Sequence, residues 1–244
     1  MDKTIYESRE AYANYDRDFV QMKKRYYYFF SLLNQHKPND VLEIGCGDGY
    51  SLELFKKEYN ECNYKGVDIS EKALAICKDK GFDVKLGDIE KEIPYEDNSF
   101  DFIIAGEVIE HIHEVDKFVS EISRILKPNG ILVITTPNLT CWYNRIFMFL
   151  GFYPLGIELS YKNKTYGRKL IYKIFNLGNR IVGHKTLFNY SSLKDILNEY
   201  NLLVTEKKGF YQEKSKLVNL VNGFFSKYVP LAPGLAFVCK NEKK

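Results

Sequence analysis

Residues 41–50, with the sequence VLEIGCGDGY, constrain the fold of this chain more than any other stretch. The apolar run 41–44 predicts a short buried strand, and residues 51–59 predict a helix. Between them lie three alternate glycines, Gly45, Gly47 and Gly49, which allow the backbone to approach a ligand where a Cβ atom would collide. A strand, a glycine turn and a helix form the first crossover of a doubly wound α/β sheet.

The residues around the glycine turn favour a cationic ligand over a phosphate. The dinucleotide fingerprint G-x-G-x-x-G holds a pyrophosphate at a helix N-terminus. Here the third glycine comes one residue early, Tyr50 stands where that fingerprint has glycine, and Glu43 precedes the first glycine by two residues. The pattern E-x-G-x-G-x-G resembles motif I of the class I methyltransferases that use S-adenosylmethionine (SAM), a cofactor with a sulfonium, an ammonium and no phosphate.

The composition argues against several other classes of protein. The chain of 244 residues has a formal net charge of only +3, so we expect no broad basic surface for nucleic acid. Its five cysteines form no C-x-x-C pair, and we expect reduced thiols rather than disulfides or a zinc site. No apolar run resembles a signal region or has the length of a spanning helix. These features predict a cytoplasmic protein.

Further candidates for cofactor binding follow the second and third predicted strands. Asp68 ends the second strand about 20 residues after the glycine turn, where doubly wound folds have an acid that binds ribose hydroxyls. The alternative role for this region is to cap the helix that begins after Ser70. Asp88 follows the third strand, 82–86, and resembles the acidic residue of the same family that binds the adenine amino group, with Ile89 against the ring.

The second half of the core extends the resemblance. Residues 99–138 contain S-F-D-x-I-x-x-x-E-V-I-E-H-I, then L-K-P-x-G, then T-P-N, which are class I methyltransferase motifs in the family's order. The resemblance covers roughly residues 40–138. It implies a Rossmann-like α/β fold, with a doubly wound, seven-stranded, mostly parallel sheet whose last strand, 235–239, is antiparallel between its neighbours. The SAM-binding residues that it implies are Glu43, Gly45, Gly47, Gly49, Asp68, Ile69, Asp88, Ile89 and Glu107.

We expect one methyltransferase domain over residues 1–244. Its predicted parts are an N-terminal helical segment (1–37), a SAM-binding core (38–138), and two helical, aromatic cap insertions (139–190 and 208–232). The first helix, 18–36, contains the run YYYFF, which either packs on the sheet or closes over the cofactor. A later helix is expected over 191–200, with Ser191 or Ser192 as its N-cap.

Glu107, Glu110 and His111 are the candidates for chemistry. Their spacing places them on one face of a helical turn, directly after the fourth strand, 102–105, where open α/β sheets bind ligands. With His184, at the end of the insertion, they form a mixed oxygen and nitrogen set that suits Mg²⁺, Mn²⁺ or Zn²⁺. The arrangement resembles two metal-dependent groups of O-methyltransferases, one acting on polyprenyl catechols of the ubiquinone type and one on the 2′-hydroxyl of small RNAs.

A reading without metal stays open. E-V-I-E-H-I also occurs in class I enzymes that use no metal, where the first glutamate faces the cofactor. His111 is then the candidate catalytic base that takes the proton of an acceptor hydroxyl. His113 lies off the shared face, and we expect it on the surface or in ordinary packing.

The cap sequences bear on the substrate. Residues 141–154 and 216–225 are mostly apolar and aromatic, with lysines and arginines nearby. Such helices lie on a membrane surface, form a lid over an apolar substrate, or cover a core of their own. All three interpretations remain open at this point.

The chain is thus predicted to be an enzyme, a SAM-dependent methyltransferase. We expect O-methylation of a hydroxyl on a small or lipid-linked molecule, such as a glycan precursor or a catechol. RNA 2′-O-methylation and a non-catalytic SAM-binding role are the alternatives. A small-molecule or lipid-linked substrate is the expected partner, peripheral contact with a membrane is an open possibility, and nucleic acid is not expected.

Overall fold

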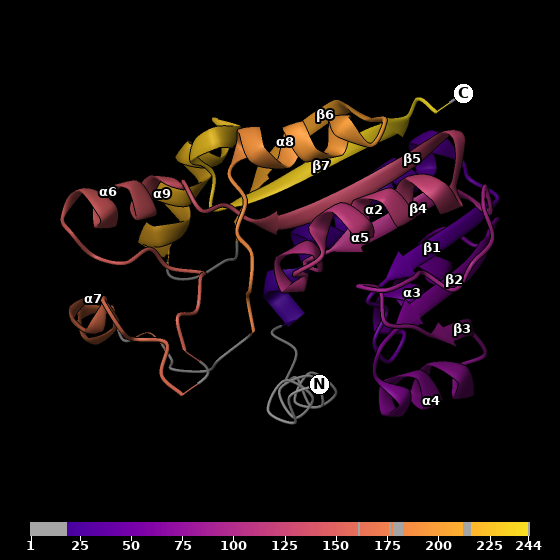
Figure 1. The fold of residues 1–244 in the computed structure, drawn as a ribbon, viewed down its shortest axis with the longest axis horizontal. Coiled ribbons are helices and arrows are strands. Elements are labelled where there is room, and N and C mark those ends of the chain that lie inside the picture. The colour runs from indigo at the N-terminus through magenta and orange to yellow at the C-terminus, as the bar shows by residue number, and fades with distance from the viewer. Residues whose placement is uncertain (1–18, 161, 176, 178–182, 212–215, 244) are drawn as a thin grey trace.

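The computed structural model describes residues 19–160, 162–175, 177, 183–211 and 216–243. The predicted start of the first helix at Asp18 lies outside these residues. One seven-stranded sheet runs through the described chain, with the strand order β3-β2-β1-β4-β5-β7-β6 (Figure 1). Its strands are β1 (Asp40–Ile44), β2 (Asn63–Asp68), β3 (Asp83–Leu86), β4 (Phe100–Gly106), β5 (Leu126–Pro137), β6 (Leu202–Phe210) and β7 (Gly234–Asn241).

The sheet topology confirms the predicted architecture. Strands β1 to β5 are paired in parallel, and β7 runs antiparallel between β5 and β6. The chain order reverses at β1, because the connection that follows β3 returns past β1 to β4. At such a switch point the loops after two neighbouring parallel strands diverge and leave room for a ligand. The L-K-P-x-G motif, 126–130, lies within β5, where Asn129 adopts the left-handed conformation with φ 62°.

Alternating side chains give the sheet two apolar faces. Leu42, Ile103 and Leu132 belong to the core under α5 (Val115–Ile125) and α8 (Tyr190–Glu199). Phe102 and Val133 belong to the opposite core, under α2 (Phe19–His36), α3 (Tyr50–Glu58) and α4 (Glu71–Asp79). Because both faces are covered, β1, β4 and β7 are buried along nearly their whole length.

Helix caps explain where two of these helices begin. Ser70 accepts a hydrogen bond from Ala73 N and is the N-cap of α4. Asn189 is the N-cap of α8, and its side chain accepts from Ser192 N while the Ser192 hydroxyl accepts from Asn189 N. The prediction of Ser191 or Ser192 as this N-cap was therefore wrong by two residues or more. Ser192 instead provides the return bond of the capping box.

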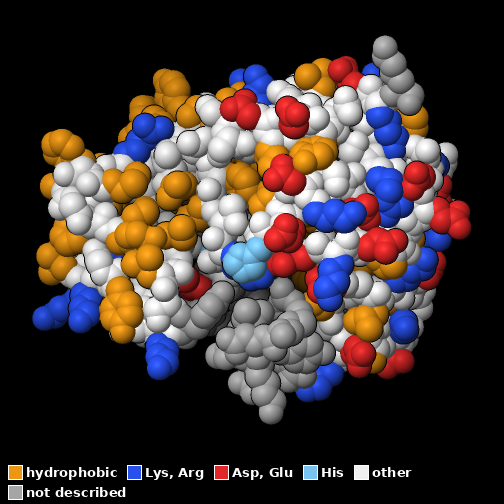
Figure 2. Space-filling model, in the orientation of Figure 1, with side chains coloured by type: hydrophobic (Ala, Val, Ile, Leu, Met, Phe, Trp, Pro, Cys, Tyr) orange, Lys and Arg blue, Asp and Glu red, His pale blue; other side chains and the backbone are white. Residues whose placement is uncertain are grey.

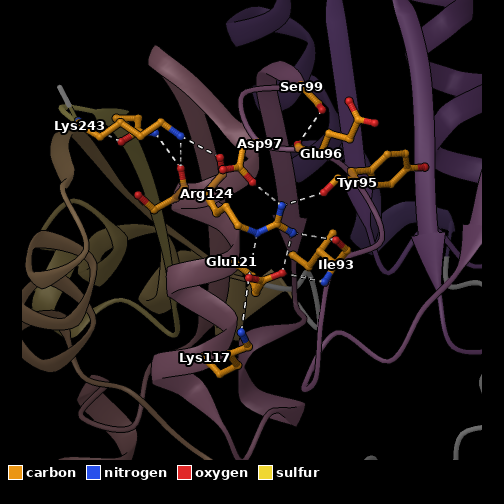
Figure 3. A network of polar contacts seen from close by, with 11 residues as sticks. Ile93, Tyr95, Glu96, Asp97, Ser99, Lys117, Glu121, Arg124 and Lys243 are labelled. Atoms are coloured by element: carbon orange, nitrogen blue, oxygen red, sulfur yellow. Dashed lines mark hydrogen bonds and ion pairs between the residues drawn. The ribbon is translucent and has the colours of Figure 1, made fainter.

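A close network fixes the connection between β3 and β4 to α5 (Figure 3). The Arg124 guanidinium donates to both carboxylate oxygens of Glu121, at 2.9 and 2.7 Å, and to Asp97 at 2.8 Å. It also donates to the carbonyls of Ile93 and Tyr95. Arg124 thereby pairs charges and satisfies loop carbonyls at the same time.

The cap is built on one end of the sheet (Figure 1). It consists of α6 (Trp142–Phe149), α7 (Lys169–Ile174), α9 (Lys216–Ser226) and the short turn η3 (Val229–Leu231). Trp142 stacks on Phe225 with ring centroids 5.2 Å apart, and its Nε1 donates to Asn222. The two cap insertions therefore form one helical layer. None of the described helices is both long and apolar enough to cross a membrane.

Candidate functional site

The glycine turn after β1 is joined to the end of β2 by the side chain of Asp68. Asp68 Oδ2 accepts from Gly47 N at 2.9 Å, and Oδ1 accepts from Ser70 N at 2.9 Å. The carboxylate is thus fixed between the turn and the start of α4. The helix-capping role considered as the alternative for this region belongs to Ser70.

Two glycines of the turn have different surroundings. Both have positive φ, 53° at Gly47 and 75° at Gly49. A Cβ added at Gly47 would meet nothing within 4 Å, whereas one at Gly49 would lie 2.5 Å from Cys77 Sγ. Gly49 is therefore required for packing of the turn against α4. Gly47 is the glycine with open space beside it, which is the condition for close approach of a ligand.

Glu43 lies beneath the turn in a buried position. Ser51, in the first turn of α3, donates to Glu43 Oε2 at 2.6 Å. Burial raises the pKa of Glu43 to about 8, although the Ser51 hydrogen bond and the charge of Arg25 act in the opposite direction. A buried carboxyl with a raised pKa gains a strong preference for a cationic neighbour.

Arg25, on α2, is a site residue that the sequence reasoning missed. Its guanidinium lies 3.8 Å from Glu107 Oε1 and 5.7 Å from the Tyr26 ring centre. Burial lowers the pKa of Arg25, but the contributions of Glu107, Tyr26 and Glu110 together outweigh burial, and the net shift is upward. Its Nε is buried without a hydrogen-bond partner among the described residues. Nothing in the tyrosine-rich sequence around this arginine marks it as a site residue.

The tyrosine-rich run of α2 divides between packing and the site. Tyr26 contacts the rings of Tyr50, Phe29 and Phe55 at centroid distances of 5.8 to 6.5 Å. Phe29 is buried in the core of this face, and Tyr27 is exposed. Ordinary helix packing therefore accounts for most of this run, and the pair of Tyr26 and Tyr50 stands closest to the glycine turn.

The loop after β3 contains the predicted adenine-binding pair. Gly87 N donates to Asp68 O at 3.0 Å, so this loop is attached to the end of β2. Asp88 accepts from Glu90 N and pairs with Lys91 at 3.4 Å. Ile89 is partly buried against the core, and Ile69, in the neighbouring loop, is also half-buried. All the predicted cofactor residues thus lie at the carboxyl ends of β1 to β4. Glu43 and Asp68 lie within β1 and β2, and the others lie in the loops that follow the strands.

Glu107 and Glu110 lie on different faces of the sheet edge. Glu107 adopts φ 59°, before the single 3-10 turn η2 (Ile109–His111), so the regular helical spacing expected here does not extend to it. The Thr135 hydroxyl donates to Glu107 Oε1 at 2.9 Å, and the Thr136 hydroxyl donates to Glu110 Oε2 at 3.2 Å. Since adjacent strand residues point to opposite faces, these two threonines hold the glutamates apart.

Three of the four predicted metal ligands converge. Glu110, His111 and His184 offer ligand atoms that all lie within 4.8 Å of one another, and Glu107 is outside this group among the described residues. Glu110 is fully buried, and its Oε1 has no hydrogen-bond partner in the described structure. Burial, reinforced by the charge of Glu107, raises the pKa of Glu110 well above its usual range. His113 is exposed on the surface.

The two histidines of the cluster are oriented by backbone carbonyls. His111 Nδ1 lies 3.1 Å from Gly183 O, and His184 Nδ1 lies 2.6 Å from Gly156 O. A carbonyl can only accept, so Nδ1 is the donor in each contact, and in the neutral imidazole Nε2 then carries the lone pair. Metal-binding imidazoles are commonly oriented by such a hydrogen bond from the other ring nitrogen to a carbonyl. The same tautomer also makes Nε2 a proton acceptor.

The end of the insertion brings His184 to the sheet. Lys185 N and Thr186 N both donate to Glu110 O, at 2.8 and 3.1 Å. The buried ammonium of Lys185 pairs with Glu90 at 2.8 Å, and the Thr186 hydroxyl donates to Ile112 O. These contacts join residues more than 70 positions apart, and no local pattern in the sequence predicts them.

Comparison with known proteins supports the resemblance over the core. Residues 42–134 match the family described as methyltransferase domain. A probable SAM-dependent methyltransferase of Mycolicibacterium smegmatis is 36% identical over 101 residues, which are 41% of this chain and 38% of that protein. Phthiotriol/phenolphthiotriol dimycocerosates methyltransferase 1 of Mycobacterium ulcerans is 30% identical over 99 residues, 39% of this chain and 36% of that protein. The chain thus spans less than two fifths of the length of these curated relatives.

The fold comparison extends over the whole chain. The N-methyltransferase NodS of Bradyrhizobium japonicum, solved with S-adenosyl-L-homocysteine, has a TM-score of 0.62 at 17% identity and covers 98% of this chain and 100% of its own. At this identity the likeness shows the fold alone. Residues 42–134 are therefore similar to the methyltransferase domain family, and the seven-stranded sheet that contains them has the same fold as this solved methyltransferase.

Proposed function

We propose that this protein is a SAM-dependent methyltransferase that methylates a hydroxyl group on a small or lipid-linked molecule. One observation carries the proposal. Residues suited to binding the cofactor and a cluster suited to deprotonating a hydroxyl lie at the same edge of the sheet, where the parallel strands end. The cofactor set is centred on Gly47 and Asp68, and the second cluster is Glu110, His111 and His184.

The residues of the cofactor set suit both ends of the SAM molecule. Asp68, already fixed by two backbone N–H groups, would accept bonds from the ribose hydroxyls. Asp88 and Ile89 would take the adenine. At the methionine end, the buried carboxyl of Glu43 and that of Glu107 suit the ammonium, and Arg25, with its unpartnered Nε, suits the carboxylate.

The methyl transfer itself requires few protein groups. The acceptor oxygen forms a bond to the methyl carbon while the carbon–sulfur bond breaks, and its electron pair stays on sulfur to give S-adenosylhomocysteine. The hydroxyl proton passes to an imidazole Nε2, for which His111 is the candidate base. An amine acceptor has its own lone pair and therefore depends less on a base such as His111.

The same cluster fits a divalent cation. The fit rests on the buried, unpartnered Glu110 Oε1 and on two imidazoles whose Nδ1 atoms face carbonyls. Glu110, His111 and His184 would hold the ion, and Glu107 is left to the cofactor. A bound Mg²⁺, Mn²⁺ or Zn²⁺ would supply Lewis-acid stabilisation of the acceptor alkoxide.

The test is turnover of SAM on matched acceptors. A phenol or catechol is compared with the corresponding aniline, both free and attached to a lipid chain, and S-adenosylhomocysteine is measured. We expect methylation of the hydroxyl compounds, reduced at least tenfold by His111→Gln or His184→Gln. His113→Gln is the matched control, because His113 is exposed and outside the cluster. Methylation of the aniline alone, unaffected by these variants, would contradict the hydroxyl assignment.

Chelation tests the metal separately. If the cluster holds an ion, EDTA should abolish turnover without changing SAM affinity, and Zn²⁺ or Mn²⁺ should raise the melting temperature of wild type and His113→Gln but not of His184→Gln. Full activity of metal-free enzyme would leave His111 as the base and exclude the cation. Absence of SAM binding in calorimetry would contradict the proposed function as a whole.

A further inference from the structure

The outer surface of the cap exposes large apolar side chains from three helices. The most exposed are Phe149 at 90%, Leu220 at 72% and Ile174 at 63%, one from each of α6, α9 and α7. Together with Leu150, Phe175 and Phe224, also exposed, they define what we call the cap face. Exposed apolar patches of this kind mark an interaction surface.

The cap face is continuous. Phe147 on α6 contacts Phe175 beside α7, with ring centroids 6.3 Å apart, and Trp142 on α6 stacks on Phe225 of α9. In the space-filling view the hydrophobic side chains gather over the end of the molecule where Figure 1 draws these helices, with lysine and arginine side chains at the rim (Figure 2). The three helices therefore present one surface.

The cap sequences carry mostly positive charge. Residues 141–183 and 216–231 contain nine lysines and arginines and a single acidic residue, Glu158. The carboxylate of Glu158 accepts a hydrogen bond from Gly183 N at 2.7 Å, within the cap. Lys169 and Lys173, on α7, and Lys227, next to α9, are exposed. Exposed apolar side chains beside exposed lysines match the interfacial region of a membrane that contains anionic lipid.

We propose that the cap face binds an anionic lipid surface. A second copy of the chain fits it less well, because a twofold interface would place the same basic rim against itself. The proposal does not depend on the proposed methyl transfer. If both hold, the bonds of Gly183 and His184 to residues 156–158 place the candidate site in the same folded unit as the bound surface.

Vesicle flotation tests the apolar part. Wild type should float with phosphatidylcholine vesicles that contain phosphatidylglycerol. The triple variant Phe149→Ser/Ile174→Ser/Leu220→Ser should lose at least about tenfold in partitioning. The matched control replaces three exposed apolar residues outside the cap, on α4, β3 and β6, with no change of charge: Ile76→Ser, Leu86→Ser and Leu203→Ser. Circular dichroism melts verify that both variants fold.

A second experiment tests the electrostatic part of the proposed lipid binding. Binding should fall several-fold between about 0.05 M and about 0.5 M salt, and should be weak on pure phosphatidylcholine. Lys169→Glu/Lys173→Glu should weaken flotation more than Lys57→Glu/Lys78→Glu, which makes the same charge change on α3 and α4. Absence of wild-type flotation, or equal loss in cap and control variants, overturns the proposal. A dimer in light scattering that the cap variant alone dissociates also overturns it, in favour of a second copy.

Discussion

Gly47 N donates to Asp68 Oδ2 at 2.9 Å, so one hydrogen bond ties the glycine turn after β1 to the end of β2. The acid is fixed in position before any ligand arrives. Binding a ribose then costs little ordering of this side chain, which is the general advantage of preorganisation. It also means that a change at Asp68 affects both the turn and the predicted cofactor contact.

Asp68→Ala should weaken SAM binding by about 1.5–3 kcal/mol, the range for hydrogen bonds to a charged group. Isothermal titration calorimetry gives the affinity directly. The control is Asp79→Ala, an exposed acid at the end of α4. Unchanged SAM affinity in the Asp68 variant would refute the ribose assignment.

Gly47→Ala and Gly81→Ala form a pair that separates backbone strain from ligand approach. Both glycines have positive φ, 53° and 82°, and in both cases the added Cβ meets nothing within 4 Å. Each substitution should therefore cost about 1 kcal/mol of stability through the left-handed conformation. Only Gly47→Ala should also reduce SAM affinity, by at least tenfold. Equal SAM affinity in the two variants would mean that no ligand approaches Gly47.

Glu43 should couple SAM binding to pH. Its pKa of about 8 keeps the carboxyl protonated in the free protein near neutrality. A cationic cofactor beside it would lower that pKa, so binding should release a proton. Affinity should then rise with pH, by about tenfold per unit at most, between about pH 5 and pH 7, where the SAM ammonium stays charged.

Calorimetry in buffers of different ionisation enthalpy counts the released protons. Glu43→Gln keeps the shape of the side chain and removes its titration, and should bind SAM with no proton release in this range. Proton release that persists in the glutamine variant would assign the coupling to another group.

Glu121 should contribute to acid stability. Its hydrogen bond to Arg124, opposed by burial, lowers the pKa of Glu121 below its usual value. A carboxyl with a depressed folded-state pKa stabilises the protein above its unfolded pKa, of about 4.3, and the contribution is lost as the pH falls through the lower, folded value. Glu121→Gln should therefore lose about 1–2 kcal/mol at pH 7 and less at pH 3.

Urea unfolding at the two pH values measures this difference. Glu58→Gln, an exposed glutamate at the end of α3, is the control and should change stability little at either pH. A loss of the same size at pH 3 and pH 7 would show that the Glu121 charge is not what stabilises the loop.

The sequence predicted the sheet because its signals are local. Residues 41–50 carry the strand, the turn and the helix start in one continuous stretch, and the structure has β1 and α3 there. The antiparallel β7 came from the family resemblance and is confirmed. Strand ends also locate Asp68 and Glu107, because carboxyl ends of parallel strands share one edge.

The side-chain partners at the site could not be predicted in the same way. The separation of Glu107 from Glu110 depends on Thr135 and Thr136, and therefore on the register of β5 against β4. The positive φ of Glu107 replaces the helical turn that its spacing suggested. Arg25 reaches Glu107 only because α2 packs across the sheet, which is a contact between distant parts of the chain.

The cap insertion begins and ends at the same point of the sheet. Asn138 and Phe188 form a parallel bridge, and Leu139 N donates to Phe188 O at 2.9 Å. The two ends of the segment between them are therefore joined to each other where it leaves and rejoins the core. Loops with adjacent ends can change length at small entropic cost. The segment could therefore be exchanged as one unit, and since His184 lies within it, one of the three proposed metal ligands would change together with the apolar surface of the cap.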